Sequence, residues 1–466
     1  MATIDGLSPF DRFRVAGSIS AEFDSANLGD KRLVDRLKLI AKRIGRAPGK
    51  SIPAASSDWA ETKAVYRFCD NETVDPTDVL DGHVDAHAAR LEARDELLVI
   101  SDTTHLTFPR HPAKEGLGDI GDSSIDIGGV KLHTTIGVDP ESGVMTGVLD
   151  QQVLIRDRDA SETHATTGRG ARETLDSEGE KWLRGDRAAL DVLPADVRPI
   201  FVHDRGADSF SFYRYMAEET PTTGYVIRAN QNRSIHTTAG SKDRLFDWSE
   251  GLAELGRTTI EIQQSGDRPS REAELSVTSG TCELLAPCND PSVRGAEAVN
   301  VVRVDEIGRD EEPIQWILFT TRPVETFEEA MIVIEYYRAR WKIEDWHRVL
   351  KSGCRIEERQ LRTWARMEVL LSICSVVAWK VLELRELARG THDTPAGQFL
   401  SDAEQAVLEE KYPEIVDGNG VAYAVAVAKV GGYLDRGSDP PPGWETMWKG
   451  LKEVRLLAEG FELGSD

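Results

Sequence analysis

The stretch Glu96-Leu-Leu-Val-Ile-Ser-Asp102 decides the fold, because a short apolar run that ends in a carboxylate is typical of a strand buried within a sheet. Two further runs have the same character: Pro199-Ile-Phe-Val-His-Asp204, which also ends in an aspartate, and Glu312 to Thr320. Lys131–Asp139 and Val144–Ile155 flank a Pro-Glu-Ser-Gly turn and predict a β-hairpin. Together these segments predict an α/β protein built on a buried mixed sheet.

The helical segments complete the expected order of elements. Hydrophobic periodicity predicts helices at about 27–48, 58–69, 76–94, 171–188, 207–218 and 325–351, with mostly helical structure from about 366. A β-rich insertion at about 222–310 precedes the last buried strand. The order strand, hairpin, helix, strand, helix, insertion, strand, helix resembles that of a ribonuclease-H-like core. We therefore expect three domains: helical residues 1–75, an α/β core at 76–370 and helical residues 371–466.

Bulk properties narrow the class of protein. The 466 residues are 40% hydrophobic and 29% charged, which is ordinary for a soluble globular protein of several domains. No stretch approaches the roughly 20 apolar residues of a membrane helix, and the N-terminus lacks the pattern of a secretory signal. The five cysteines are odd in number and scattered, which fits reduced thiols. We expect a cytoplasmic protein without a structural zinc site.

The net charge is unfavourable for a nucleic-acid partner, but the distribution of charge along the chain is not. The formal charge is −24, which opposes non-specific attraction to DNA. However, Lys31–Lys50 contains eight basic residues and one acid, and Arg338–Arg366 contains nine basic residues and four acids. From Thr391 onward there are six basic and fourteen acidic residues. Two basic tracts are therefore available for DNA, and the acidic C-terminal region is predicted not to contact it.

Two strand-end aspartates point to a metal site. If their strands are neighbours, Asp102 and Asp204 emerge at the same sheet edge, within reach of common cations. Mg²⁺ prefers hard oxygen ligands and keeps several waters, so two or three carboxylates suffice to hold it. Two such ions about 4 Å apart activate the attacking oxygen and stabilise the leaving oxygen in phosphodiester chemistry. Strand-end aspartates also cap helices, and the pattern alone leaves both interpretations open.

A third carboxylate lies in Tyr337-Arg-Ala-Arg340-Trp-Lys-Ile-Glu344-Asp-Trp-His-Arg-Val-Leu-Lys351. The spacings place Tyr337, Arg340, Glu344 and Lys351 on one face of a continuous helix. One carboxylate among a phenol, a guanidinium and an ammonium suits a metal ligand surrounded by phosphate-binding groups. The alternative is a solvated helix with local ion pairs, which the two tryptophans in the segment disfavour.

These motifs together resemble the cut-and-paste DDE transposases of the insertion-sequence-four type, the family of the transposase of transposon five. The helix matches the Tyr–Arg–Glu–Lys signature of that family without a gap, and the surroundings of Asp102 and Asp204 match its two catalytic aspartates. Further matching segments are Asn27–Arg32, Gly49–Ile52, Val65–Phe68 and Gly431–Asp435, together with Trp444 and Trp448.

The resemblance implies a DNA transposase with an N-terminal domain that binds transposon ends and a C-terminal dimerisation domain. It implies two Mg²⁺ ions, or Mn²⁺ in their place, held by Asp102, Asp204 and Glu344. The chemistry would comprise nicking at inverted-repeat ends, excision through a DNA hairpin and joining to target DNA by a homodimer acting on a prokaryotic nucleoid. By position, the expected DNA contacts are Tyr337, Arg340, Lys351, Trp316, Arg228, Arg32, Lys50 and Arg67. Trp316 would stack on a flipped base.

Several alternatives remain open at this point. A stand-alone nuclease would use the same core without the flanking regions, whereas a DNA-binding regulator would not need the acidic triad. Trp316 could be an ordinary core residue. Asp208 is expected to cap the helix after Asp204 rather than to orient the metal site. His83 and His87, four residues apart, are expected to form a surface pair on a helix.

Overall fold

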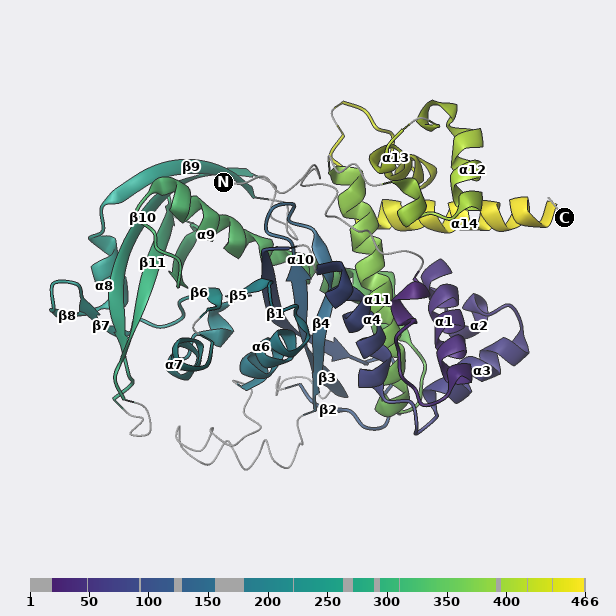
Figure 1. The fold of residues 1–466 in the computed structure, drawn as a ribbon, viewed down its shortest axis with the longest axis horizontal. Helices are drawn as coiled ribbons and strands as arrows, with labels where there is room; N and C mark the ends of the chain where they lie inside the picture. Colours follow the sequence, from purple (N-terminus) through teal and green to yellow (C-terminus); the bar gives the residue numbers. More distant parts are fainter. Residues whose placement is uncertain are drawn as a thin grey trace.

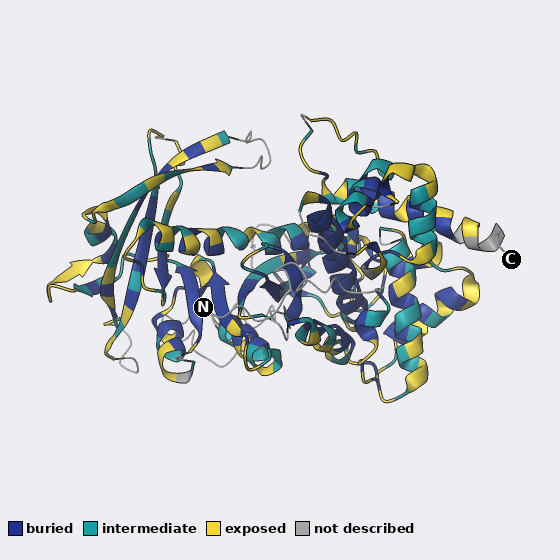
Figure 2. Cartoon of the chain, turned by 45° about the horizontal axis from the view of Figure 1, so that its top comes forward, coloured by how far each residue is buried: buried dark blue, intermediate teal, exposed yellow. Residues whose placement is uncertain are grey.

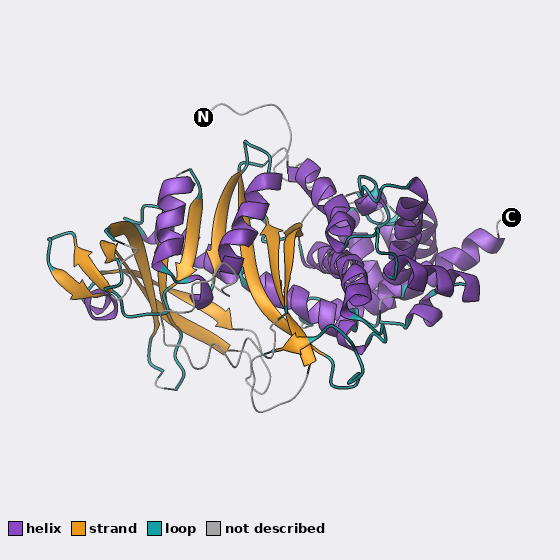
Figure 3. Ribbon diagram, turned by 90° about the horizontal axis from the view of Figure 1, so that it is seen from below, coloured by secondary structure: helices purple, strands orange, loops and turns teal. Residues whose placement is uncertain are grey.

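The computed structural model describes residues 19–47, 49–91, 94–120, 128–155, 180–220, 222–262, 271–288, 294–309, 311–390, 395–416, 418–437 and 439–464. In this part of the chain no helix is long and apolar enough to cross a membrane. The strands gather in one half of the molecule with helices packed beside them, and the other half is helical (Figure 3).

Helices form the N-terminal region (purple in Figure 1). They are η2 (Ala21–Phe23), α1 (Lys31–Arg46), α2 (Ile52–Ala55), α3 (Trp59–Cys69) and α4 (Pro76–Leu91). Asp30 caps α1 by accepting a hydrogen bond from the backbone N–H of Arg32. Leu37, Ile40 and Ile44 are buried along one face of α1 while its basic side chains face outward, which confirms the predicted amphipathic helix.

The expected surface pair on α4 is wrong. His83 and His87 are both fully buried. The Nδ1 atom of His83 lies 2.6 Å from a carboxylate oxygen of Glu22, and the Nε2 atom of His87 lies 2.7 Å from the hydroxyl of Thr146. Each imidazole therefore joins α4 to another element through a buried hydrogen bond, which local spacing on one helix does not reveal.

The described strands form one mixed sheet. They are β1 (Glu96–Thr107), β2 (Gly118–Asp119), β3 (Gly128–Val138), β4 (Met145–Leu154), β5 (Arg198–His203), β6 (Gly224–Arg228), β7 (Ser234–Thr237), β8 (Lys242–Arg244), β9 (Glu254–Ile262), β10 (Arg271–Leu285), β11 (Ala296–Glu306) and β12 (Gln315–Thr320). The order is β2-β3-β1-β5-β6-β12-β11-β10-β7-β8, with β4 paired to β3 and β9 paired to β10. The predicted hairpin is β3 and β4, which pair antiparallel.

Both faces of the central strands are buried, as the apolar runs predict (Figure 2). Along β1, Leu98 and Ile100 contribute to the core beneath the N-terminal helices, whereas Leu97 and Val99 contribute to a second core on the opposite face. The second core is covered by α6 (Glu180–Val192) and α7 (Phe210–Glu219), which follows the short helix η4 (Arg205–Ala207). The order of elements predicted for the core is therefore confirmed.

The insertion extends the same sheet instead of forming a separate one. Strands β7 to β11 continue it beyond β12 (left in Figure 1), and the short helix α8 (Leu245–Glu250) interrupts them. β6 lies inside the core, because it pairs in parallel with β5 and antiparallel with β12. The last buried strand begins later than expected, since Glu312 has a φ of 46° and belongs to the preceding turn.

The helix expected at 325–351 consists of three pieces. These are α9 (Phe327–Ala339), α10 (Trp341–Arg348) and the π-helical turn η5 (Val349–Gly353), with η6 (Ile356–Glu358) after it. Arg340 keeps helical angles, so α9 and α10 run on almost continuously. In η5 the N–H of Cys354 donates to the carbonyl of Val349, five residues back. This wider turn moves Lys351 off the helical face that a regular period of 3.6 residues predicts.

One long helix, α11 (Trp364–Arg389), joins the regions of the molecule. It packs against α1, α3 and α4 on one side and against β4, α13 and α14 elsewhere. The elements that follow are η7 (Ala396–Gln398), α12 (Asp402–Lys411), η8 (Pro413–Ile415), α13 (Gly420–Val430) and α14 (Trp444–Gly464). They share a third apolar core with the end of α11, which confirms a helical C-terminal region.

Candidate active site

Parallel pairing places the strands of Asp102 and Asp204 side by side. β1 and β5 pair in parallel with Ile100 opposite Val202. Asp102 and Asp204 each lie two residues further along, so they share the sheet face of Ile100 and Val202. The two aspartates therefore lie on neighbouring strands, as expected. Asp102 does not end its strand, however, because β1 continues to Thr107 paired with β3, whereas Asp204 directly follows the last residue of β5.

The third carboxylate reaches the same face from α10. Ile343 and Trp346 anchor α10 in the core that contains Ile100. Glu344 lies between them in sequence and remains partly exposed, at 31% of its side chain. The helix therefore holds Glu344 over the sheet face that carries the two aspartates.

Arg340 lies between two of the carboxylates. Its Nη2 atom donates to Oε1 of Glu344 at 2.7 Å, and its Nη1 atom lies 3.6 Å from Oδ2 of Asp102. The Arg340 side chain is only 11% exposed, so water screens these interactions weakly. A single guanidinium thus compensates the negative charge of Asp102 and Glu344.

The electrostatics of Asp102 reflect this crowding. Burial has the largest influence and raises the pKa of Asp102 to about 6, and the charges of Asp204 and Glu344 add to the rise. Arg340 and the backbone N–H of Thr103, which donates to Oδ1 at 2.7 Å, oppose it. A carboxyl group that repels two neighbouring carboxylates gains from any additional cation at this position.

The donor set suits a divalent cation. Three carboxylates offer only hard oxygen ligands, the type that Mg²⁺ prefers, and their mutual repulsion favours a cation between them. Within the described residues, however, no three His, Cys, Asp or Glu side chains are already close enough together to hold a metal ion. Arg340 provides the positive charge between Asp102 and Glu344 in this arrangement. The residues thus fit a metal by their chemistry, with the guanidinium as an alternative cation.

A buried histidine network supports the aspartates from the opposite sheet face, and sequence reasoning missed most of it. His203 pairs through Nε2 with both carboxylate oxygens of Asp186 at 3.1 Å. The ring of Trp182 packs against His203 and against His133, which hydrogen-bonds Thr103 beside Asp102. In the sequence, only the position of His203 directly before Asp204 indicated this network, because Asp186 and His133 come from other segments of the chain.

Four of the expected DNA contacts cluster at or beside this site. The rings of Trp316 on β12 and Tyr337 on α9 meet edge to face with centroids 5.3 Å apart. The guanidinium of Arg340 lies 6.0 Å from the Tyr337 ring centroid. Arg228 on β6 donates to the carbonyl of Gln315 at 2.7 Å. Trp316 is half-buried, so it contributes to the core and also retains an exposed part.

The remaining expected contacts lie elsewhere. Lys351 is half-buried in η5, where its charge, second to burial, lowers the pKa of His347 to about 3. Arg32 and Arg67 are exposed on α1 and α3, away from the carboxylates, and Arg32 pairs with Asp30 at 2.7 Å. Lys50 is exposed beside a cavity described below.

The expected capping role of Asp208 is wrong, because Ser209 caps α7. Asp208 instead pairs with Arg233 at 2.8 Å and accepts hydrogen bonds from Tyr213 and from the backbone N–H groups of Asn230 and Gln231. These contacts hold the loop after β6 against the segment that follows Asp204.

Comparison with known proteins agrees with this geometry. Residues 93–379 match the family model of the transposase DDE domain, and residues 16–74 match that of the transposase DNA-binding domain. A solved piggyBac transposase synaptic complex with hairpin DNA is 10% identical, with a TM-score of 0.37 over 97% of this chain and 80% of that chain, a likeness too weak to carry an argument. The DDE domain has a ribonuclease-H-like core and requires a divalent metal, generally Mg²⁺. The chain belongs to the DDE-domain transposases, enzymes that cut and join DNA.

Proposed function

We propose that this protein is a cut-and-paste transposase of the insertion-sequence-four type that nicks transposon ends with Asp102, Asp204 and Glu344. The single observation that carries the proposal is the convergence of these three carboxylates from β1, β5 and α10 onto one face of the sheet beside Arg340. Structural carboxylates are normally separated or paired one to one, because grouping them raises the free energy of the folded chain.

The carboxylates and the basic residues of the site would have different roles in phosphodiester cleavage. Asp102, Asp204 and Glu344 would hold two Mg²⁺ ions, with Mn²⁺ able to replace them; when bound, such ions would activate the attacking water and stabilise the leaving oxygen. Arg340, whose guanidinium lies beside Asp102 and Glu344, would bind a phosphate oxygen of DNA held at this site. Lys351, in the turn that follows α10, would bind a neighbouring phosphate.

The aromatic pair would serve the hairpin step. In this proposal a base pulled from the duplex stacks on the exposed part of Trp316, and the strand then bends back on itself. Tyr337 holds the indole edge to face at 5.3 Å, and Arg228 stays beside them on β6. A stack of this kind contributes about 1–3 kcal/mol, comparable with the energy needed to flip one base.

Each of the three regions of the chain would have its own role in transposition. Residues 1–75 would bind the inverted-repeat ends through the outward basic face of α1, including Arg32, with Lys50 and Arg67 nearby. Residues 76–370 would carry the chemistry on both the ends and the target DNA. Residues 371–466 would pair two copies of the chain, because Leu456 and Leu457 expose 66% and 47% of their surface on α14.

Two other functions are separable by experiment. A stand-alone nuclease would cut DNA without joining it, and a regulator would bind ends without cutting. The test is to incubate the protein with Mg²⁺ and linear DNA that carries the inverted repeats flanking its own gene, together with a supercoiled target plasmid. We expect hairpin-ended donor fragments and joined products; cutting without joining, or binding without cutting, would replace the proposal by the respective alternative.

A further inference from the structure

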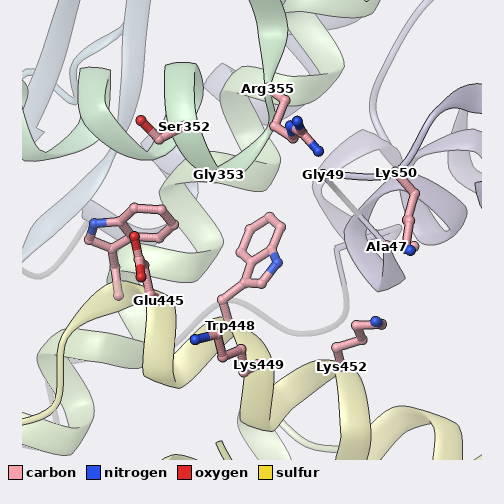
Figure 4. Close-up of a pocket in the computed structure, with 11 residues that line it drawn as sticks. Ala47, Gly49, Lys50, Ser352, Gly353, Arg355, Glu445, Trp448, Lys449 and Lys452 are labelled. Atoms are coloured by element: carbon pink, nitrogen blue, oxygen red, sulfur yellow. The ribbon is translucent and has the colours of Figure 1, made fainter. Parts of the chain in front are cut away.

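A cavity of about 300 Å³ lies where three regions of the chain meet (Figure 4). Its walls come from the segment that follows α1, from η5 and the residues after it, and from the first turns of α14. It is distinct from the candidate active site, because none of the three carboxylates lines it. Because residues of the N-terminal, core and C-terminal regions all line the cavity, a ligand bound there would contact all three regions.

The cavity is electropositive within a region that is acidic by sequence. Lys50, Arg355, Lys449 and Lys452 line it, opposed by the single acid Glu445. Arg355 pairs with a neighbouring carboxylate at 2.5 Å, whereas the three lysines form no ion pair with any residue that the structure describes. Two of the six basic residues after Thr391 are thus gathered on one turn of α14 and face basic groups from elsewhere in the chain.

Two tryptophans accompany these cations. The indole of Trp448 extends from α14 toward Gly49 and Arg355, with Lys50 and Lys452 to one side of it (Figure 4). Trp444 lies so close to Gly353 that a Cβ atom there would be 3.2 Å from the indole. Both rings are half-buried. Flat aromatic surfaces beside unpaired cations are the features with which proteins bind unpaired nucleotides, since bases stack and phosphates pair with lysine.

The position of the cavity suits a strand that leaves the catalytic centre. Gly353 follows Glu344 by nine residues along α10 and η5, which is about 14 Å of helix. One duplex strand advances about 3.4 Å per nucleotide, so this distance corresponds to about four nucleotides. A volume of about 300 Å³ is at the lower end of small-ligand sites and fits one nucleotide rather than a duplex.

We propose that this cavity binds an unpaired nucleotide of a DNA strand that passes the catalytic carboxylates, with its base against Trp448 and its phosphates against Lys50, Lys449 and Lys452. The inference rests on the proposed DNA-cutting function and extends it, because it makes the acidic C-terminal region a DNA contact. The sequence predicted that this region avoids DNA.

Photocrosslinking tests the location directly. The probe is a single-stranded oligothymidylate of eight nucleotides with one 5-iododeoxyuridine, irradiated with the full-length protein. We expect a crosslinked tryptic peptide that spans residues 437–449 and contains both tryptophans. Crosslinks confined to other peptides, or equal crosslinking of this peptide by the blunt duplex of the same sequence, would overturn the proposal.

Affinity measurements test the contacts. By fluorescence anisotropy, Trp448→Ala should weaken binding of the oligonucleotide about five- to a hundredfold. Because Trp448 also packs on the core, the double variant Lys449→Glu, Lys452→Glu provides a second test that leaves the indoles in place. It should lower the slope of log affinity against log salt by about 1.4, or about 0.7 for each lost phosphate contact. Lys411→Glu, at an exposed lysine on α12, is a charge-reversal control outside the cavity and should change neither quantity.

The outcomes separate this proposal from the function on which it rests. Unchanged affinity and salt slope in folded variants would overturn the DNA role of the cavity. Glu344→Gln should keep the crosslink at residues 437–449 and lose DNA nicking. Continued nicking by that variant would contradict the catalytic assignment and leave the crosslink result standing, whereas loss of nicking without that crosslink would refute the cavity proposal alone.

Discussion

Replacing Trp316 by alanine separates a structural role of this residue from a role in base flipping. Trp316 is half-buried and meets Tyr337 edge to face at 5.3 Å. Losing that aromatic contact lowers the free energy of unfolding by about 0.5–1.5 kcal/mol, and truncating a fully buried tryptophan to alanine lowers it by about 3–5 kcal/mol. For a half-buried ring we therefore expect a decrease of about 2 kcal/mol in the free energy of unfolding.

The rate effect should differ between the two chemical steps. Loss of a base stack worth about 1–3 kcal/mol should slow hairpin formation roughly five- to a hundredfold, because about 1.4 kcal/mol corresponds to a tenfold change in rate. The first nick precedes base flipping and should remain within about threefold of the wild-type rate. Trp316→Phe keeps an aromatic contact for Tyr337 with a smaller stacking surface, so it should melt close to the wild-type temperature and slow the hairpin step by less.

The assay follows nicked and hairpin products on denaturing gels and compares them with thermal melting. Equal slowing of both steps, together with a large decrease in melting temperature, would refute the base-stacking role and leave Trp316 as a core residue. Normal hairpin formation in a folded Trp316→Ala variant would refute it as well.

Three further predictions follow from named contacts. Arg340→Ala removes the cation beside Asp102 and Glu344 and should slow nicking at least tenfold in the plasmid assay, with partial recovery in Arg340→Lys; an unaffected rate would exclude a role for the guanidinium. Burial lowers the pKa of His87 well below its usual value, so the neutral ring stabilises the fold above about pH 6.5; urea denaturation should show this contribution lost toward pH 5, by up to about 2 kcal/mol, and a His87→Gln chain with unchanged pH dependence would contradict it. Leu456→Glu with Leu457→Glu should leave single-end binding intact in gel shifts and abolish paired-end complexes, unlike a Glu453→Gln control; undiminished pairing would disprove dimerisation through α14.

The order of elements in the core could be predicted because each buried strand has a strong local signal. Apolar runs at β1 and β5 specify strands buried on both faces, and the aspartates that follow the two runs lie side by side because the strands are parallel neighbours. The continuation of β1 past Asp102 to Thr107 was not predicted, because the mainly polar residues there are held by pairing with β3, a segment distant in sequence. The signature residues of α9 and α10 were predictable for the same reason, since Arg340 and Glu344 are four residues apart on nearly continuous helix.

Other features depend on contacts between distant segments. His83 and Glu22 are 61 residues apart, and Asp208 and Arg233 are 25 apart, so no local pattern indicates either buried pair. The π-helical turn at Lys351 follows from how the chain leaves α10 toward α11, which helical periodicity does not encode. The basic cavity was also not predictable, because the acidic composition after Thr391 outweighs the two lysines of α14 that line the cavity together with Lys50.

The central claim is that Asp102, Asp204 and Glu344 together catalyse DNA cleavage, and one measurement tests it most directly. Wild-type protein and the variants Asp102→Asn, Asp204→Asn and Glu344→Gln are incubated with Mg²⁺ and a supercoiled plasmid that carries the transposon ends, and nicking and end binding are recorded separately. We predict that each variant nicks at least about a thousandfold more slowly, which corresponds to about 4 kcal/mol of lost transition-state stabilisation, while end binding stays within about threefold of the wild-type value. Nicking near the wild-type rate by any one of the three variants would contradict the account.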